Sequence, residues 1–380
     1  MTKDAPARPH GPAEPIPLTV LTGFLGAGKT SLLNRLIHDP ALAETAVIIN
    51  EFGEIGLDHL LVRPIRDGVV LLQSGCLCCT LRGDLVEALE QLLRDLDNGR
   101  VAFRRVILET TGLADPAPVL QTAMAHPYLV QRFRLDGVIT VVDAVNAAAT
   151  LDQHMESVRQ VAVADRIVLT KTDLLAAAER ERALGDLRAR LAALNPAAPI
   201  LDATAGAATA RNLLGCGLFD PDRKSPDVKR WLAEEAYAAE PPHGPHQHRH
   251  DPNRHDERIR AFTLTSDVPI PAASFEMFID LLRSLHGPKL LRLKGIVKIA
   301  EEPARPLVIH GVQHVLHPAV RLEGWPDDDQ RTRIVLITRD LSAGEVGPLF
   351  DAFLNRSAPD RPDRAALLDN PLVPFGGRDR

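Results

Sequence analysis

The chain has 380 residues, of which 45% are apolar, 25% charged and 4% aromatic. At about 100–200 residues per domain, this length predicts two domains and is sufficient to bury a core without disulfides. The net charge of −6 disfavours nucleic acid as a partner. Because no apolar run approaches the ~20 residues that a membrane-spanning helix needs, we expect no membrane association.

The N-terminal region is rich in proline and has no apolar stretch of the kind found in a secretory signal. Three of the four cysteines occur together in Cys76-Leu-Cys-Cys79, which is not the spacing of a disulfide framework. We therefore expect the protein to work in the reducing cytoplasm.

Between Pro17 and about Leu214, short β-branched runs alternate with helical stretches, which predicts a parallel sheet flanked by helices in an α/β domain. The strands are mostly apolar rather than alternating, as expected for strands buried on both faces. The predicted strands are Leu18–Thr22, Ala46–Asn50, Val69–Gln73, Arg105–Glu109, Gly137–Val142, Arg166–Thr170 and Ile200–Ala203. The predicted helices are Ser31–Ile37, Leu81–Leu96 and Leu174–Leu194.

A change in composition marks the end of this domain. Residues 241–256 interleave four prolines with five histidines and cannot form a packed core, which predicts a linker. After it, one helix among several strands predicts a smaller α+β domain with an antiparallel sheet. Its elements are the strand Arg258–Thr265, the helix Ala272–Leu285 and strands near Gly295–Ala300, Leu307–Gly311, Val315–Leu316 and Arg333–Thr338.

These boundaries predict five segments. Residues 1–15 form a disordered Pro-rich leader, and 16–215 form the larger α/β domain. Residues 216–257 form a connector that contains the His-rich linker. Residues 258–356 form the smaller domain, and 357–380 form a flexible tail.

The strongest motif is Gly23-Phe-Leu-Gly-Ala-Gly28-Lys29-Thr30, which matches G-x-x-x-x-G-K-[ST] between a predicted strand and a predicted helix. Its glycines allow backbone N–H groups to turn inward around phosphates at a helix N-terminus. We expect Lys29 to reach the β- and γ-phosphates and Thr30 to coordinate Mg²⁺. The predicted nucleotide contacts of this loop are Gly23, Gly26, Ala27, Gly28, Lys29, Thr30 and Ser31.

A second motif, Glu109-Thr-Thr-Gly112, ends the strand Arg105–Glu109. Glu109 is placed to hold Mg²⁺ directly or through water, and the Gly112 amide to contact a γ-phosphate, so that hydrolysis releases the loop. The alternative is a strand-end glutamate in an ordinary loop, which the pairing with the phosphate loop disfavours.

The third motif, Thr170-Lys-Thr-Asp173, concerns the base. A carboxylate at Asp173 can accept hydrogen bonds from guanine N1–H and its 2-amino group, which adenine does not offer together. The aliphatic stem of Lys171 can lie along the base plane. Guanine-specific switches usually have Asn where this chain has Thr170, but Asp173 and its position favour GTP over ATP.

The cysteine cluster lies between a predicted strand and a predicted helix. Thiolates are suited to Zn²⁺ and other late metals, and a helix N-terminus favours the thiolate form. Cys76 and Cys78 face the same way in an extended segment, whereas Cys76 and Cys79 do so in a coiled one. Buried structural cysteines and a Cys76–Cys79 redox pair are the alternatives to a metal site. Cys216, isolated in sequence, is expected to be structural or to have no role.

So short a segment does not easily supply a complete ligand shell. Carboxylates in the segment that follows the second strand are candidates to complete it, and this is where a γ-phosphate-sensing switch normally lies. The candidates are Glu51, Glu54 and Asp58, of which we take Glu54 as the metal ligand.

These motifs, in this order and at these distances, resemble the CobW-type metallochaperone GTPases of the P-loop class. The resemblance covers about residues 17–356, because Gly287-Pro-Lys-Leu-Leu-Arg-Leu-Lys-Gly295 is similar to the family's C-terminal domain. It implies GTP hydrolysis coupled to loading of a metal, most often zinc and in some members cobalt or iron, into client proteins. It also implies that Cys76, Cys78 and Cys79 handle the metal.

The histidine linker has two interpretations. His246, His248 and His250 form a loose, weak metal-collecting tract, as tracts of this kind do in the family that the chain resembles, or the segment is a solvated spacer. Their spacing fixes no rigid geometry.

The sequence suggests a mechanism in which GTP·Mg²⁺ orders Asn50–Asp58 and brings its carboxylates toward the thiolates, while hydrolysis lowers the affinity for metal. Asp58 or Glu51 would position the attacking water. The alternatives are a GTPase assembly switch with a structural metal and a non-enzymatic metal store or sensor. Expected partners are metal-dependent client proteins, together with a second copy of the chain in a nucleotide- or metal-dependent dimer.

Overall fold

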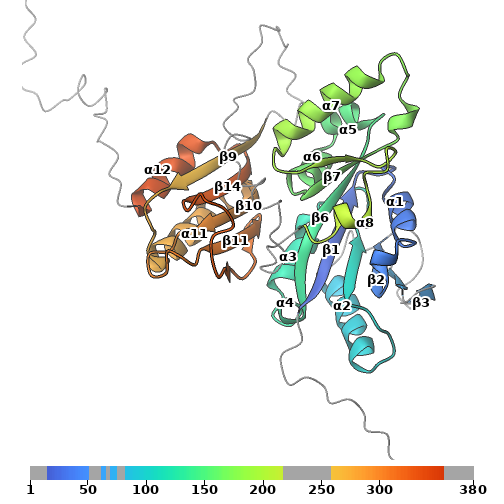
Figure 1. Cartoon of the computed structure of the whole chain (residues 1–380), viewed down its shortest axis with the longest axis horizontal. Coiled ribbons are helices and arrows are strands. Elements are labelled where there is room, and N and C mark those ends of the chain that lie inside the picture. The colour runs from blue at the N-terminus through green and yellow to red at the C-terminus, as the bar shows by residue number, and fades with distance from the viewer. Residues whose placement is uncertain (1–14, 51–60, 66–68, 75–81, 217–257, 355–380) are drawn as a thin grey trace, which may run out of the picture.

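The computed structural model describes residues 15–50, 61–65, 69–74, 82–216 and 258–354, which form two packed halves (Figure 1). No helix in this described part is long and apolar enough to cross a bilayer. The predicted leader, His-rich linker and tail lie outside the described residues.

The N-terminal half is built on an eight-stranded sheet with the strand order β3-β4-β2-β5-β1-β6-β7-β8. The edge strand β3 runs antiparallel to β4, and the other neighbours are parallel. The strands are β1 (Ile16–Gly23), β2 (Thr45–Asn50), β3 (Leu61–Ile65), β4 (Val69–Ser74), β5 (Arg105–Glu109), β6 (Phe133–Asp143), β7 (Arg166–Thr170) and β8 (Ile200–Asp202).

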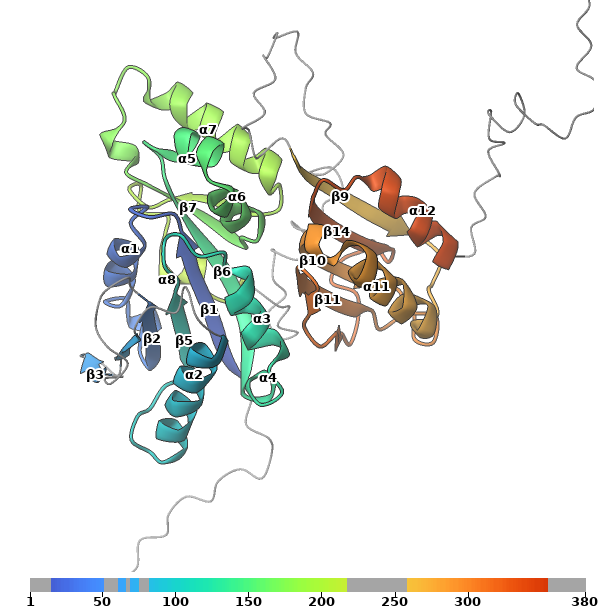
Figure 2. The same cartoon turned by 180° about the vertical axis from the view of Figure 1, so that it is seen from behind.

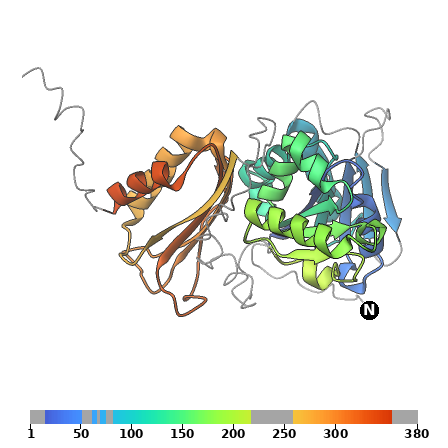
Figure 3. The same ribbon diagram turned by 90° about the horizontal axis from the view of Figure 1, so that it is seen from above.

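Helices cover both faces of this sheet because its central strands are apolar on both sides. Leu21 and Val168 face α1 and α8, whereas Leu18 and Leu169 belong to clusters on the opposite face, under α2, α3, α6 and α7. Seen from above, the sheet lies between these layers (Figure 3). The helices are α1 (Lys29–Leu36), α2 (Arg82–Asp97), α3 (Ala117–Ala125), α4 (Leu129–Arg132), α5 (Ala147–Gln153), α6 (Met155–Ala162), α7 (Arg180–Leu194) and α8 (Ala210–Leu213).

The C-terminal half is an antiparallel sheet in the order β12-β11-β10-β14-β9, with β13 paired to β11. Helices α11 (Ala272–His286) and α12 (Ala343–Phe353) cover one face through a cluster that includes Phe275, Phe278 and Phe350. The other face turns toward the N-terminal half (Figure 2). The strands are β9 (Ile259–Ser266), β10 (Leu290–Val297), β11 (Leu307–Val312), β12 (Val315–Leu316), β13 (Val320–Arg321) and β14 (Thr332–Arg339).

The predicted fold class is confirmed, with three corrections to element bounds. The strand expected over Gly137–Val142 is β6, which begins four residues earlier at Phe133 because it pairs with β1 from Ile16 onward. The strand expected near Gly295–Ala300 is β10, which begins five residues earlier at Leu290 because β11 and β14 pair with it over Leu290–Val297. The helix expected over Leu174–Leu194 begins at Arg180, because residues 172–174 form a separate short turn.

The two halves meet at a buried cluster of charges centred on Asp165, the residue before β7. Arg292 donates two hydrogen bonds of 3.0 Å to the Asp165 carboxylate, and Lys294 bonds to the same group. Both cations come from β10, and the side chain of Asp165 has no solvent exposure. Burial alone would raise the pKa of Asp165, but the charges of Arg292 and Lys294 outweigh it and hold the pKa well below its usual value.

Apolar contacts surround this charge cluster. Leu291 of β10 joins the cluster that contains Leu187 and Leu191 of α7, and Val312 of β11 joins Leu120 of α3. A hydrogen bond of 2.8 Å from Gln121 to Gln313 adds a polar contact on the α3 side. The C-terminal sheet is therefore fixed to α3 and α7 of the N-terminal half.

We predict that Asp165→Asn lowers the free energy of unfolding by about 3–5 kcal/mol, because it removes the carboxylate that offsets two buried cations. Chemical denaturation of the full chain measures this. Asp97→Asn is the matched control, since the Asp97–Arg132 pair leaves the Asp97 side chain 52% exposed. That control is expected to cost at most about 1 kcal/mol. Equal losses in the two variants would contradict the prediction.

The stability of the chain is expected to depend on pH through His310. Burial, with the nearby charge of Arg292, holds the pKa of His310 in β11 well below its usual value. The unfolded chain, with a histidine pKa of about 6.5, therefore takes up this proton first as the pH falls. Stability is retained above that value and lost below it. We expect His310→Gln to flatten the fall in unfolding free energy between pH 7.5 and 5, measured by denaturant titration. An unchanged slope would contradict this.

Candidate nucleotide-binding site

The loop between β1 and α1 has a backbone that only glycine permits at its ends. Gly23 has a φ of 145°, and a Cβ on it would lie 2.3 Å from the carbonyl oxygen of Val141. Gly26 and Gly28 also have positive φ values, of 74° and 92°. The loop therefore follows the compact path that its sequence motif predicts, and it leads directly into the N-terminus of α1.

Lys29 begins α1, and its amine turns back into the loop. The amine donates to the carbonyl oxygens of Gly23 at 2.9 Å and Phe24 at 3.2 Å. The residue is buried, so its positive charge is held inside the loop rather than in solvent. Together with the partial positive charge of the helix N-terminus, it makes the loop a site for an anion.

Thr30, in the first turn of α1, meets Glu109 at the end of β5, as their motifs require. The Thr30 hydroxyl donates to Oε1 of Glu109 at 2.8 Å. Glu109 is buried at the end of β5, which pairs with β1 through Leu21 and Glu109. A hydroxyl and a carboxylate at this separation are the oxygen ligands that Mg²⁺ prefers, so the pair fits that ion.

The segment that follows Glu109 lies against the phosphate loop. Thr110 donates its amide to Leu21 O and its hydroxyl to Thr22 Oγ1, each at 2.9 Å. A Cβ on Gly112 would lie 2.5 Å from Leu25 Cα and 2.6 Å from Leu25 N. A glycine is therefore required at 112 for the two loops to touch.

The end of β7 closes the other side of the phosphate loop. The Thr170 hydroxyl lies 2.7 Å from Ala27 O and 3.3 Å from Val142 O, both acceptors. Lys171 has a φ of 58° and donates to Gly26 O at 2.8 Å and to Asp143 at 2.7 Å. Thr170 thus joins the base motif to the phosphate loop through its hydroxyl, despite the departure from Asn.

Asp143, at the end of β6, was not anticipated from the sequence. Burial would raise its pKa, but hydrogen bonds from Lys171, Asn146 and two backbone amides hold the pKa below its usual value. The carboxylate is therefore ionised and holds Lys171 in place. It is a strand-end acid like Glu109, and the same rule applied to the strand that ends at Asp143 would have found it.

Two other residues of the predicted site lie at the edge of this assembly. Ser31 is exposed in the first turn of α1, and Asp173 is exposed in the turn after β7. The backbone carbonyl of Asp173 accepts a hydrogen bond of 2.8 Å from Arg180. Its carboxylate role in base recognition stays a prediction.

The predicted transition-metal and water-positioning residues lie outside the described part of the chain. These residues are Glu51, Glu54, Asp58, Cys76, Cys78, Cys79, His246, His248 and His250. Within residues that the structure does describe, no group of three or more His, Cys, Asp or Glu side chains is arranged to hold a metal. Cys216 is buried, its thiol lies 3.1 Å from Leu213 O, and burial raises the pKa of that thiol.

The strands that lead into two of these segments end side by side. In the parallel pair β2 and β4, Asn50 is in register with Ser74. In the neighbouring pair β2 and β5, Ile49 is in register with Glu109. The carboxylate segment, which follows Asn50, and the cysteine segment, which follows Ser74, therefore both begin at the carboxyl ends of the parallel strands, as does the segment after Glu109.

Comparison with known proteins identifies relatives over most of the chain. Residues 17–202 match the family model described as "CobW/HypB/UreG, nucleotide-binding domain", and residues 259–354 match the "Cobalamin synthesis protein cobW C-terminal domain". The zinc chaperone YjiA of Escherichia coli is 36% identical over 88% of this chain and 98% of its own length. A zinc chaperone CobW of Pseudomonas aeruginosa is 31% identical over 87% and 89%.

The fold is similar to a solved structure as well. The crystal structure of Zn(II)-bound YjiA GTPase from E. coli superposes with a TM-score of 0.62 at 31% identity, covering 90% of this chain and 99% of that one.

We predict that Gly112→Ala weakens binding of a non-hydrolysable GTP analogue by about tenfold or more and leaves GDP affinity unchanged. The added methyl group meets the Leu25 backbone, which cannot rotate away, so the segment around residue 112 must move away from the phosphate loop. This removes the expected contact of Gly112 with the γ-phosphate, which GDP lacks. Titration with fluorescent nucleotides measures both affinities. Gly185→Ala in α7 is the control, because a Cβ there meets nothing within 4 Å. Equal losses for both nucleotides would contradict the prediction.

Proposed function

The chain belongs to the CobW/HypB/UreG family of P-loop GTPases, and from this membership we propose that it uses GTP hydrolysis to bind zinc and transfer it to client proteins. It is a GTPase, so the reaction is conversion of GTP and water to GDP and phosphate. The cargo, its ligands and the transfer step are the parts that we propose.

The nucleotide phosphates and their Mg²⁺ are held by the loop 23–30 and by Glu109. The N–H groups of the loop 23–30 and the amine of Lys29 hold the β- and γ-phosphates. Thr30 and Glu109 hold Mg²⁺, which supplies charge neutralisation at the phosphates when bound. The buried, low-dielectric position of Lys29 strengthens its interaction with the developing negative charge.

For the base, Asp173 selects guanine by accepting two hydrogen bonds. Thr170 and Lys171 fix the strand end from which Asp173 projects, through their bonds to Ala27 and Gly26. These bonds hold the base-reading turn at one distance from the phosphate loop. The proposed preference for GTP over ATP rests on the Asp173 carboxylate.

For the cargo, the ligands are the thiolates of Cys76, Cys78 and Cys79, completed by Glu54. Glu51 or Asp58 positions the attacking water. Zinc is favoured over cobalt because the relatives YjiA and CobW are named zinc chaperones. The histidines His246, His248 and His250 act as a weak collecting tract.

One observation carries the proposal: the register of Asn50 with Ser74, beside that of Ile49 with Glu109. Because parallel strands end at a common edge, a carboxylate segment that responds to the γ-phosphate and a cysteine segment that binds metal start next to each other and to Glu109. Binding of the γ-phosphate by the carboxylate segment can therefore change the metal affinity of the neighbouring cysteine segment directly.

We predict that Mg²⁺ and a non-hydrolysable GTP analogue raise the zinc affinity of the full chain over its affinity with GDP. Loss of one or two ligands on hydrolysis is sufficient for a large change, since a ~10⁴-fold shift needs ~5.5 kcal/mol of differential binding. Anaerobic competition with a chelator measures it. Equal zinc affinity with the two nucleotides would disprove the coupling.

Three variants separate the alternatives. Cys78→Ser should lose tight zinc binding but keep GTP hydrolysis, whereas unfolding would indicate a structural metal. Cys216→Ser is the matched control, because that thiol is buried and is not one of the proposed cargo ligands. Lys29→Ala should abolish nucleotide-dependent zinc transfer to a client, and intact transfer would indicate a passive store.

A further inference from the structure

Helix α6 carries a side chain that holds the segment after Glu109 in place. Gln160 is 1% exposed, and its Nε2 donates to the carbonyl oxygens of Ala114 at 3.0 Å and Gly112 at 3.3 Å. Two carbonyls of one short loop are thus bound by one amide from a helix more than 40 residues later in the chain.

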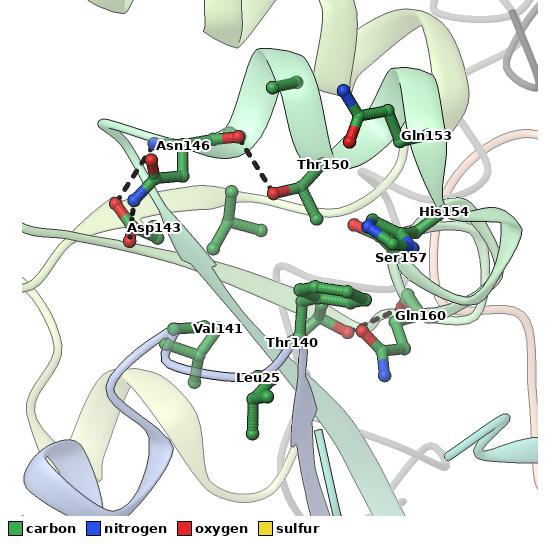
Figure 4. A pocket seen from close by; sticks show the side chains of 15 residues that line it. Leu25, Thr140, Val141, Asp143, Asn146, Thr150, Gln153, His154, Ser157 and Gln160 are labelled. Atoms are coloured by element: carbon green, nitrogen blue, oxygen red, sulfur yellow. Dashed lines mark hydrogen bonds between the residues drawn. The ribbon is translucent and has the colours of Figure 1, made fainter. Parts of the chain in front are cut away.

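Gln160 is itself anchored to the sheet. Its backbone carbonyl accepts a hydrogen bond of 2.6 Å from the Thr140 hydroxyl in β6 (Figure 4). The neighbouring Arg159 forms a second connection to the same loop, through a bond of 2.8 Å to Asp115. The loop 111–115 is therefore connected to α6 at three acceptors and cannot shift as a unit without breaking these bonds.

The orientation of the bound carbonyl has a consequence for the next amide. In a trans peptide the N–H of Leu113 points opposite to the C=O of Gly112. Because Gln160 draws that carbonyl toward α6, the Leu113 N–H is turned away from α6. The Gly112 backbone meanwhile lies against Leu25 of the phosphate loop, at a separation that leaves no room for a Cβ.

Beside this contact is a cavity of about 300 Å³, lined among others by Phe24, His154, Ser157 and Gln160. Figure 4 shows the Gln160 side chain at this cavity, close to Thr140 and the phosphate loop. Its Oε1 has no hydrogen-bond partner among the described residues. The side-chain amide of Gln160 therefore donates to the loop, while its oxygen accepts no hydrogen bond from the described residues. The bonds to Gly112 and Ala114 thus set the orientation of this amide.

We propose that Gln160 is a positioning residue for GTP hydrolysis, which holds the loop 111–115 against the phosphate loop in the pose that senses the γ-phosphate. The inference rests on the proposed γ-phosphate contact of that loop. It does not depend on the cargo metal.

The test compares two substitutions of similar shape in the full chain. Gln160→Met removes the donors, and Gln160→Glu replaces them with a carboxylate that faces two carbonyl oxygens. We expect Met to lower kcat and the ratio of GTP-analogue to GDP affinity by about tenfold, and Glu to lower both further. A packing role would change stability but leave this ratio as in the wild type.

The matched control is Gln153→Met, because Gln153 lines the same cavity, is exposed, and makes no bond to the loop that the structure records. It should match the wild type in kcat and in nucleotide ratio. If Gln160→Met does not fold, Arg159→Met decides, because its side chain is part-exposed and holds the same loop through Asp115. An unchanged nucleotide ratio in the folded variant would overturn the proposal.

Gly112→Ala separates this inference from the role of the loop itself. If Gly112→Ala lowers the nucleotide ratio and Gln160→Met does not, Gln160 is not the positioning residue although the loop senses the γ-phosphate. If neither variant lowers it, the proposed γ-phosphate contact of the loop is wrong as well.

Discussion

The side chains of Lys29, Lys171 and Thr170 bind carbonyl groups of the phosphate loop, and the rest of the nucleotide site depends on these bonds. Lys29 binds the carbonyls of Gly23 and Phe24, Lys171 binds that of Gly26, and Thr170 binds that of Ala27. Each of these bonds fixes the plane of one peptide, and with it the direction of the N–H group in that peptide. The loop's capacity for an anion is thus built before any nucleotide arrives. Preorganised donors of this kind need no rearrangement when negative charge develops.

A second constraint joins the two halves of the chain. One carboxylate, Asp165, faces two cations from β10 inside the interface. Such a group is costly to bury alone, so the C-terminal sheet and the N-terminal half depend on each other electrostatically. The same Asp165 accepts a bond from the Val138 amide and thereby fixes the spacing of β6 and β7, the strands that end at Asp143 and Thr170. The interface and the base motif are therefore opposite ends of one strand.

Local pattern predicted the parallel sheet, and the motifs named residues that the structure brings together around the loop 23–30. Strands such as Arg105–Glu109 and Arg166–Thr170 were predicted to the residue, because an apolar run buried on both faces has clear ends. The start of β10 was predicted five residues too late, because the β-branched run after Gly295 has the stronger local strand pattern. Pairing with β11 and β14 determines the actual start. Gln160, Asp165 and Arg292 were not predicted at all. Their roles come from partners tens of positions away, which periodicity does not reveal.

Only five positions separate Gln160, which binds the loop after Glu109, from Asp165, which binds the C-terminal sheet. Between them α6 ends at Ala162, and β7 begins directly after Asp165, at Arg166. The nucleotide-binding half is consequently not a portable module. Joined to an unrelated C-terminal half, it would keep its phosphate loop but bury the Asp165 carboxylate without cations to pair with it. The end of α6 that carries Gln160 would then be less firmly held.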